Sequence, residues 1–225
     1  MKEQKSAIDY HDIDCWIFDL DNTLYPVTTP LLAELDSQMS RFVANFLGVD
    51  GEEARKIQKA YFHQYGLTLR GLMIHHNLDP EEFFSAMTPT NLAEIKPNPN
   101  LGEAIKRLPG RKLIYTNSYR KHAEMVLVRL KILDAFEDIF DITAADFIPK
   151  PNSEPYQRLC QIHSIKPENA LMVDDIARNL EPAGKLGMTT VWMQTKAEWA
   201  TTEERIEYVD FEIRNIDQWV AAAAD

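Results

Sequence analysis

Residues 13–19 read Ile-Asp-Cys-Trp-Ile-Phe-Asp, a short apolar run that ends in a carboxylate. A run of this length with such flanks predicts a buried strand. Pro26 and Pro30 follow closely and interrupt regular structure. We therefore expect the ordered part of the chain to open on a strand that carries an acid, Asp19, at its end.

The second half of the chain alternates short apolar runs with helical periodicity. This alternation predicts βαβ units around a parallel sheet. Right-handed crossovers favour a doubly wound, Rossmann-like α/β arrangement. The further strands are expected at residues 112–116, 139–143, 170–174, 189–193 and 209–213, and the helices at 101–108, 120–130, 154–163, 177–186 and 216–223.

A block between the first two strands is helical throughout. Apolar residues recur at spacings of three and four from Leu31 to Phe46, and shorter helices are expected at 52–65, 68–76 and 80–86. The segment 96–100 then reads Lys-Pro-Asn-Pro-Asn, which predicts a stiff connector. We expect a helical cap domain at 27–96, inserted into a core formed by 1–26 and 97–225, and cap motion about 25–29 and 96–99.

Composition excludes several classes of protein. A formal net charge of −11 argues against a nucleic-acid polymer as partner, although a small anion can still bind at a local site. Cys15 and Cys160 form no motif of a disulfide framework or zinc site. The segment 1–14 is polar, and no run of about 18 apolar residues occurs, so we expect no membrane association and a cytoplasmic location.

In open α/β sheets, ligand sites form at the carboxyl ends of the strands. Polar residues occupy the predicted strand ends in this chain. They are Asp19 and Asp21 after the first strand, Thr116, Asn117 and Ser118 after the second, Lys150 in a loop after the third, and Asp174 and Asp175 at the end of the fourth.

These residue types match the needs of phosphoryl transfer. Asp19, Asp175 and the carbonyl of Asp21 are hard oxygen ligands suited to Mg²⁺, which would screen a phosphate dianion from an anionic nucleophile. Lys150 would add a fixed positive charge beside the phosphoryl oxygens. Asp19 could then attack in line to form an aspartyl-phosphate, with Asp21 protonating the leaving oxygen and later activating water.

The second strand end would complete the phosphate site. The hydroxyl of Thr116 and the backbone amides near Asn117 and Ser118 can donate to phosphoryl oxygens. Each motif alone has a plainer interpretation, because paired Asp residues are commonly solvated and Thr-Asn-Ser commonly caps a helix. Their occurrence in order at successive strand ends favours the functional interpretation.

Taken together, these motifs resemble those of the haloacid dehalogenase superfamily, subfamily IA. Asp19-Leu-Asp-Asn-Thr-Leu is similar to its first motif, and Thr116, Lys150 and Asp174-Asp175 to its second, third and fourth. The resemblance implies a C1-type cap, Asp19 as nucleophile, Asp21 as acid/base and a magnesium shell of Asp19, Asp21 and Asp175. Asn179 stands where many relatives carry an acid, so Asp174 remains open as a direct ligand, with Asp175 favoured.

Within the superfamily, Asp21 favours a phosphatase. The dehalogenases lack this second acid because they have no phosphate leaving group to protonate. The phosphonatases use a cap lysine as a Schiff base, whereas Lys56 and Lys59 lie in a charged helix typical of a solvated face.

A narrower resemblance concerns the cap. Residues 21–26, Asp-Asn-Thr-Leu-Tyr-Pro, and 65–71, Tyr-Gly-Leu-Thr-Leu-Arg-Gly, are similar to the pyrimidine 5′-nucleotidase branch. This implies a substrate such as UMP or CMP, with Arg70, His63 and Tyr65 meeting the base or ribose. The alternative is that the aromatic residues of this stretch form the cap core.

Two other functions remain open from the sequence. One is a phosphatase of another small phosphorylated metabolite, such as a sugar phosphate or phosphoglycolate. The other is a catalytically idle interaction protein that kept the fold. The sequence does not indicate an oligomeric state or a pathway.

Overall fold

The computed structural model describes residues 10–26, 29–87, 92–195 and 207–225. In this part of the chain, six strands form one parallel sheet in the order β3-β2-β1-β4-β5-β6. The doubly wound arrangement is therefore confirmed. The strands are β1 (Cys15–Phe18), β2 (Arg111–Tyr115), β3 (Asp138–Phe140), β4 (Ala170–Asp174), β5 (Thr189–Met193) and β6 (Phe211–Ile213).

The strand order reverses between β1 and β4, which is the topological switch point of this sheet. The register is explicit, because Phe18 at the end of β1 pairs with Ile114 of β2 and Val173 of β4. The amide of Asp19 then donates to the Val173 carbonyl at 2.9 Å. The carboxyl ends of β1 and β4 are thus level with each other.

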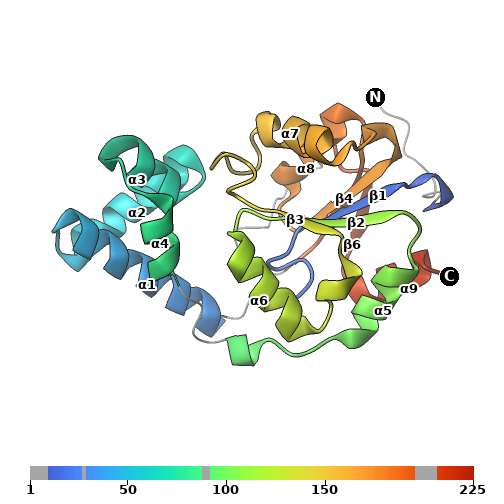
Figure 1. The fold of residues 1–225 in the computed structure, drawn as a ribbon, viewed down its shortest axis with the longest axis horizontal. Helices are drawn as coiled ribbons and strands as arrows, with labels where there is room; N and C mark the ends of the chain where they lie inside the picture. The colour runs from blue at the N-terminus through green and yellow to red at the C-terminus, as the bar shows by residue number, and fades with distance from the viewer. Residues whose placement is uncertain (1–9, 27–28, 88–91, 196–206) are drawn as a thin grey trace.

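Helices cover both faces of the sheet (Figure 1). Trp16 and Phe18 of β1 are buried in a core shared with α5, α6 and α9, whereas Cys15 and Ile17 are buried against α7 and α8. This alternation follows from the period of two along a strand. The core helices are α5 (Pro99–Arg107), α6 (Arg120–Leu130), α7 (Ser153–His163), α8 (Ala177–Leu186) and α9 (Ile216–Ala223), with 3₁₀ turns at η1 (Tyr10–Asp12), η2 (Leu92–Glu94), η3 (Leu133–Ala135) and η4 (Pro167–Asn169).

Several elements differ in their limits from the sequence prediction, and β6, expected at 209–213, begins at Phe211. Pro99 lies in the first turn of α5 and Asn98 caps it by accepting from the Leu101 amide, so the second half of the expected stiff connector is a helix start. Proline suits this position because its missing N–H is not needed there. The strand expected at 139–143 ends at Phe140, because Asp141 caps the next turn through the Ala144 amide.

Four helices form a separate lobe, at the left of Figure 1, which we call the cap helices. They are α1 (Thr29–Leu47), α2 (Gly51–Tyr65), α3 (Thr68–His76) and α4 (Pro80–Ala86). They bury their own apolar cluster, including Val43, Ala54 and Leu72. Asp50 caps the start of α2, and Gly66 ends it in the left-handed conformation, so the helix lies close to the expected 52–65. The domain limits at residues 26/27 and 96/97 stay a prediction, and residues 27 and 28 of the expected hinge lie outside the described residues.

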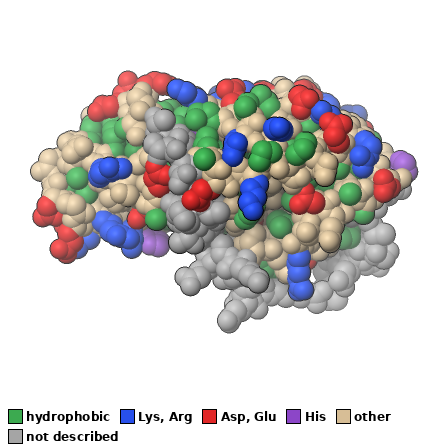
Figure 2. Space-filling model, turned by 90° about the horizontal axis from the view of Figure 1, so that it is seen from below, with side chains coloured by type: hydrophobic (Ala, Val, Ile, Leu, Met, Phe, Trp, Pro, Cys, Tyr) green, Lys and Arg blue, Asp and Glu red, His purple; other side chains and the backbone are tan. Residues whose placement is uncertain are grey.

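Acidic and basic side chains are interspersed on the face shown in Figure 2, without a continuous basic patch. Among the described helices, none has both the length and the apolar character needed to cross a bilayer.

The packing of α3 on α2 generates a stability prediction. A Cβ added to Gly71 would lie 2.3 Å from Cγ of the Tyr61 ring. We expect Gly71→Ala to lower the free energy of unfolding by about 1–3 kcal/mol, the usual cost of overpacking. Urea denaturation followed by circular dichroism measures this change.

Gly51→Ala is the matched control, because a Cβ there would meet nothing within 4 Å. It lies in the same lobe, at the start of α2. Its effect should be stabilising or below about 1 kcal/mol, since alanine favours helix. Equal destabilisation by both substitutions would contradict the packing argument.

Candidate active site

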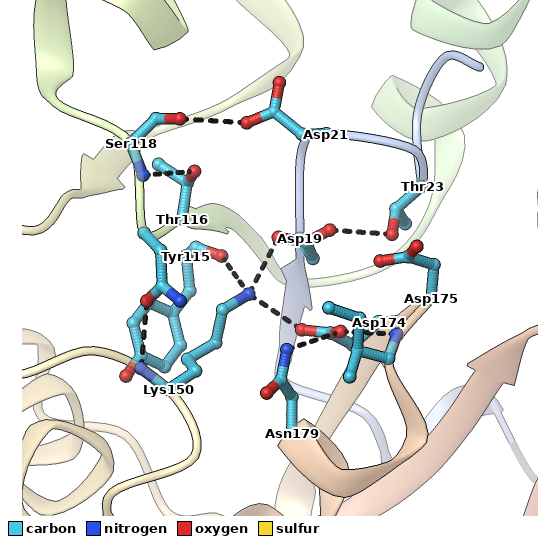
Figure 3. A network of polar contacts seen from close by, with 12 residues as sticks. Asp19, Asp21, Thr23, Tyr115, Thr116, Ser118, Lys150, Asp174, Asp175 and Asn179 are labelled. Atoms are coloured by element: carbon cyan, nitrogen blue, oxygen red, sulfur yellow. Dashed lines mark hydrogen bonds and ion pairs between the residues drawn. The ribbon is translucent and has the colours of Figure 1, made fainter. Parts of the chain in front are cut away.

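The predicted residues of the core converge at the carboxyl ends of β1, β2 and β4 (Figure 3). Asp19 follows β1, Thr116 follows β2, and Asp174 ends β4. Lys150 comes from the loop between β3 and α7 and reaches the same point. All four residues are buried. The sheet therefore assembles these distant parts of the chain into one site.

Lys150 is the central contact of this site. Its Nζ donates to Asp19 Oδ1 and Asp174 Oδ2, each at 2.7 Å, and to the Tyr115 carbonyl at 3.1 Å. Burial alone would lower the pKa of Lys150, but the carboxylates of Asp174 and Asp19 raise it above the ordinary value. Lys150 is consequently a charged amine that links the ends of β1 and β4.

Asp19 is held from both sides. Its Oδ2 accepts from the Thr23 hydroxyl at 2.8 Å, while Oδ1 accepts from Lys150. Burial raises the pKa of Asp19. The charges of Asp174 and Asp175 raise that pKa further, and the charge of Lys150 opposes the increase. The result is a carboxylate with a fixed orientation in a poorly solvated environment, which suits a nucleophile.

The donor set fits a divalent cation. One carboxylate oxygen from each of Asp19, Asp174 and Asp175 lies within 4.8 Å of the others, and all three residues are buried. Burial, and next the charge of Asp174, raise the pKa of Asp175 to about 7. Lys150 is the one cation bonded within this cluster of three acids among the described residues. A hard cation such as Mg²⁺ would offset the remaining repulsion.

The hydrogen bonds distinguish the two acids at the end of β4. Asp174 Oδ2 accepts from Lys150, and Oδ1 accepts from the Asn179 side chain and the Ile176 amide, both at 2.9 Å. Asp175 Oδ2 accepts from Asn22 at 2.6 Å. Asp174 thus accepts three orienting hydrogen bonds and Asp175 accepts one, which leaves more of the Asp175 carboxylate for a direct bond to a cation.

Asp21 has different surroundings from Asp19. It accepts from the Tyr25 hydroxyl, from the Ser118 hydroxyl at 2.9 Å, and lies 3.4 Å from Nε2 of the buried His122. Burial raises the pKa of Asp21, but the bonds to His122, Tyr25 and Ser118 outweigh it and lower the pKa to about 2. Asp21 is therefore ionised near neutral pH in this structure.

The second strand end positions other groups. The Ser118 amide donates to the Thr116 hydroxyl at 3.0 Å. The Asn117 side-chain oxygen accepts from the Lys150 amide at 2.9 Å, so Asn117 anchors the loop that carries the lysine. Asn117 and Ser118 also line a cavity of about 310 Å³ beside Asp21.

Three cap residues expected at the substrate lie elsewhere in this structure. Arg70 Nη1 donates to the Phe147 carbonyl at 2.8 Å, the Tyr65 hydroxyl bonds Nε2 of His75, and His63 is exposed. None of the three lines the cavity beside Asp21. Their contact with substrate stays a prediction.

Sequence reasoning missed two partners of Asp21. Tyr25 follows Asp21 by four residues, so its proximity could have been inferred from a tight turn after the strand. His122 is 101 residues away and reaches Asp21 only through the first turn of α6. A histidine four residues after the strand-end Ser118 was the available signal.

Comparisons with known proteins define the class. The haloacid dehalogenase-like hydrolase family matches residues 13–187, which is most of the chain and includes every residue of the candidate site described above. The chain therefore belongs to this family of hydrolases.

Individual proteins that resemble the chain share less than a third of its residues. The chain is similar to Phosphate metabolism protein 8 of Saccharomyces cerevisiae, at 29% identity over 77% of this chain and 59% of the yeast protein's length. It is also similar to glyceraldehyde 3-phosphate phosphatase of Pyrococcus furiosus, at 26% identity over 89% of each chain. CbbY from Rhodobacter sphaeroides, solved with xylulose 1,5-bisphosphate, has 19% identity and a TM-score of 0.62 over 92% of this chain and 96% of CbbY, and shows the fold alone.

The raised pKa of Asp175 predicts how magnesium and pH interact. In the metal-free protein this acid binds its proton more tightly when folded than when unfolded, so its contribution to stability falls as pH rises from about 4 to about 7. A cation competes with that proton. We expect Mg²⁺ to raise the melting temperature more at pH 8 than at pH 5.5, measured by differential scanning fluorimetry.

Asp175→Asn should reduce this pH dependence, because the amide has no proton to exchange for the cation, while Asp19, whose pKa is also raised, would retain part of it. The control is Asp12→Asn, which changes an exposed acid before β1, at the opposite end of that strand from Asp19. An identical magnesium shift at both pH values in the unmodified protein would count against the site.

Proposed function

We propose that this protein is a magnesium-dependent phosphomonoesterase that works through an aspartyl-phosphate on Asp19. The observation that carries the proposal is the Asp19–Lys150–Asp174 contact at the switch point, with Asp21 two residues on and facing a cavity. The family, and the Pyrococcus relative that is named a phosphatase, support a phosphatase.

The chemistry assigned to the residues is a double displacement. The Asp19 carboxylate attacks phosphorus, the bond from phosphorus to the leaving oxygen breaks, and Asp21 gives that oxygen a proton. Asp21 then takes a proton from a water molecule while the water oxygen attacks the phosphorus of the aspartyl-phosphate. The bond between Asp19 and phosphorus breaks, which releases inorganic phosphate and restores the Asp19 carboxylate. A phosphate dianion beside Asp21 would raise its low pKa by like-charge repulsion, so that it can carry the proton.

The remaining core residues would bind and orient the phosphoryl group. Lys150 and the Thr116 hydroxyl, with the amides of Asn117 and Ser118, are the proposed donors to its oxygens. Mg²⁺, when bound, would supply charge neutralisation. Its proposed ligands are Asp19, Asp175 and the carbonyl of Asp21, with Asp174 orienting Lys150.

The proposed substrate is a pyrimidine nucleoside 5′-monophosphate. The supporting features are the resemblance at 65–71 and an aromatic wall in which Phe84 stacks on Tyr119 with ring centroids 4.7 Å apart. A sugar phosphate is the second candidate, because the Pyrococcus relative is named for a triose phosphate. We further propose that the cap at 27–96 closes over the core. A cytoplasmic location is also proposed, which the free cysteines Cys15 and Cys160 support.

Substitution of the two acids tests the mechanism. Asp19→Asn should reduce phosphate release from p-nitrophenyl phosphate on the order of 10³-fold or more, because the nucleophile is lost. Asp21→Asn should reduce it by about 10²–10⁴-fold, the usual contribution of acid–base catalysis, with magnesium affinity largely retained. Asp12→Asn should turn over like the unmodified protein.

An unmodified protein that releases no phosphate with Mg²⁺ present would instead support the idle interaction protein. Retained turnover in Asp19→Asn would remove the nucleophile assignment.

A substrate panel tests the cap assignment. We expect kcat/KM for UMP and CMP to exceed that for glyceraldehyde 3-phosphate and ribose 5-phosphate by 10-fold or more, on the order of one well-placed contact. Phosphate release under initial-rate conditions gives the values. Sugar phosphates that match or exceed the nucleotides would favour the second candidate.

A further inference from the structure

The cavity beside Asp21 has two unlike ends. Its polar end is formed by Asp21, Asn117, Ser118 and His122, and the rest is formed largely by apolar side chains of the cap helices, among them Met39, Leu69 and Phe83. Its volume of about 310 Å³ lies at the lower end of the range for small-molecule sites. Asp21 thus lies where the phosphate site meets an apolar chamber.

The polar groups that lie in the apolar walls already have partners within the protein. The Thr68 hydroxyl donates to the Gln58 carbonyl at 3.0 Å, and the Tyr119 hydroxyl donates to the Met87 carbonyl at 2.6 Å. These hydroxyls therefore have no hydrogen left to donate to a ligand. A substrate rich in hydroxyl groups would lose its water contacts in this chamber and gain few in return.

Apart from His122, which already lies 3.4 Å from Asp21, the chamber, where the structure describes it, offers no basic side chain to receive a second anionic group. Among its described lining residues there is neither a lysine nor an arginine. The nearby cations have other contacts: Arg70 donates to the Phe147 carbonyl, and Arg120 pairs with Asp138 at 2.7 Å. A carboxylate or second phosphate held there would be desolvated without a counter-charge.

Aromatic packing holds one wall in place. Phe84 of α4 stacks on Tyr119, with an interplanar angle of 18°, and Phe147 stacks on Phe84 with centroids 6.4 Å apart. Phe84 comes from the cap helices and the other two rings from the core. This wall offers a flat apolar surface without ordering flexible side chains.

We propose that the leaving group of the substrate is uncharged and presents an apolar or aromatic face to this chamber, and that esters carrying a second phosphate or a carboxylate are excluded. The inference rests on the proposed function and deepens it, because it separates substrate classes that share the same phosphoryl chemistry. It favours a nucleoside or aryl-alkyl ester over phosphoglycolate or a sugar bisphosphate.

Matched pairs of esters test this selection. Benzyl phosphate and phosphoglycolate are both esters of primary alcohols, but the first carries an aromatic ring where the second carries a carboxylate. Fructose 6-phosphate and fructose 1,6-bisphosphate differ by one phosphate. We expect kcat/KM for the ester with the uncharged leaving group to be at least 10-fold higher in each pair. Equal values, or a preference for the charged member, would overturn the proposal.

A substitution tests the role of charge directly. Met39 is only partly buried, so Met39→Lys can place an ammonium at the chamber wall, and Met39→Gln is the neutral control of similar length. The lysine variant should raise kcat/KM for phosphoglycolate relative to benzyl phosphate by 5-fold or more, and the glutamine variant should not. The same ratio in both variants would contradict the proposal.

Binding by the unmodified protein keeps the test independent of folding of the variants and of turnover. Isothermal titration calorimetry with Mg²⁺ should show benzylphosphonate binding at least 10-fold more tightly than phosphonoacetate. That preference without hydrolysis of any ester would remove the phosphatase function and retain the selection. Hydrolysis of benzyl phosphate and phosphoglycolate with equal kcat/KM, and equal affinity for the two phosphonates, would retain the phosphatase and remove the selection.

Discussion

The amine of Lys150 lies buried between the carboxylates of Asp19 and Asp174, 2.7 Å from each. A buried ammonium must be paired and hydrogen-bonded, and so must the acids around it. The loop after β3 is therefore obliged to return to the switch point, where Asn117 holds its backbone. Removing the amine would leave buried acids, Asp175 included, without a counter-charge. The geometry of the whole site depends on this contact.

The two acids of the first motif, Asp19 and Asp21, differ in their surroundings. Asp19 lies within the charged cluster, where burial raises its pKa, whereas Asp21 faces hydroxyl donors and His122, which lower its pKa to about 2. Different environments for neighbouring acids are how a protein assigns them different roles. Two residues of separation after a strand are enough to place one acid at the cluster and the other at the cavity.

The cap helices then decide what lies beyond Asp21. They have an apolar cluster of their own and meet the core through a few contacts, among them the stacking of Phe84 on Tyr119 and the bond from Arg70 to the Phe147 carbonyl. Under the proposed function, the core would contact only the phosphate, which all such esters share. Under the same proposal, the surface that the cap presents would select the substrate, and few substitutions would be needed to change that selection.

The amino-acid sequence by itself determined the doubly wound sheet and the acids and lysine at its strand ends, because apolar periodicity and strand-end residues are local patterns. Only the tertiary structure decided which groups meet. Asp174 proved to bind Lys150 through one oxygen and the turn before α8 through the other, and His122 reached Asp21 across 101 residues. It also directed Tyr65 toward His75 rather than toward the cavity. Contacts between distant elements depend on how helices pack, and periodicity specifies that a face is buried without specifying its partner.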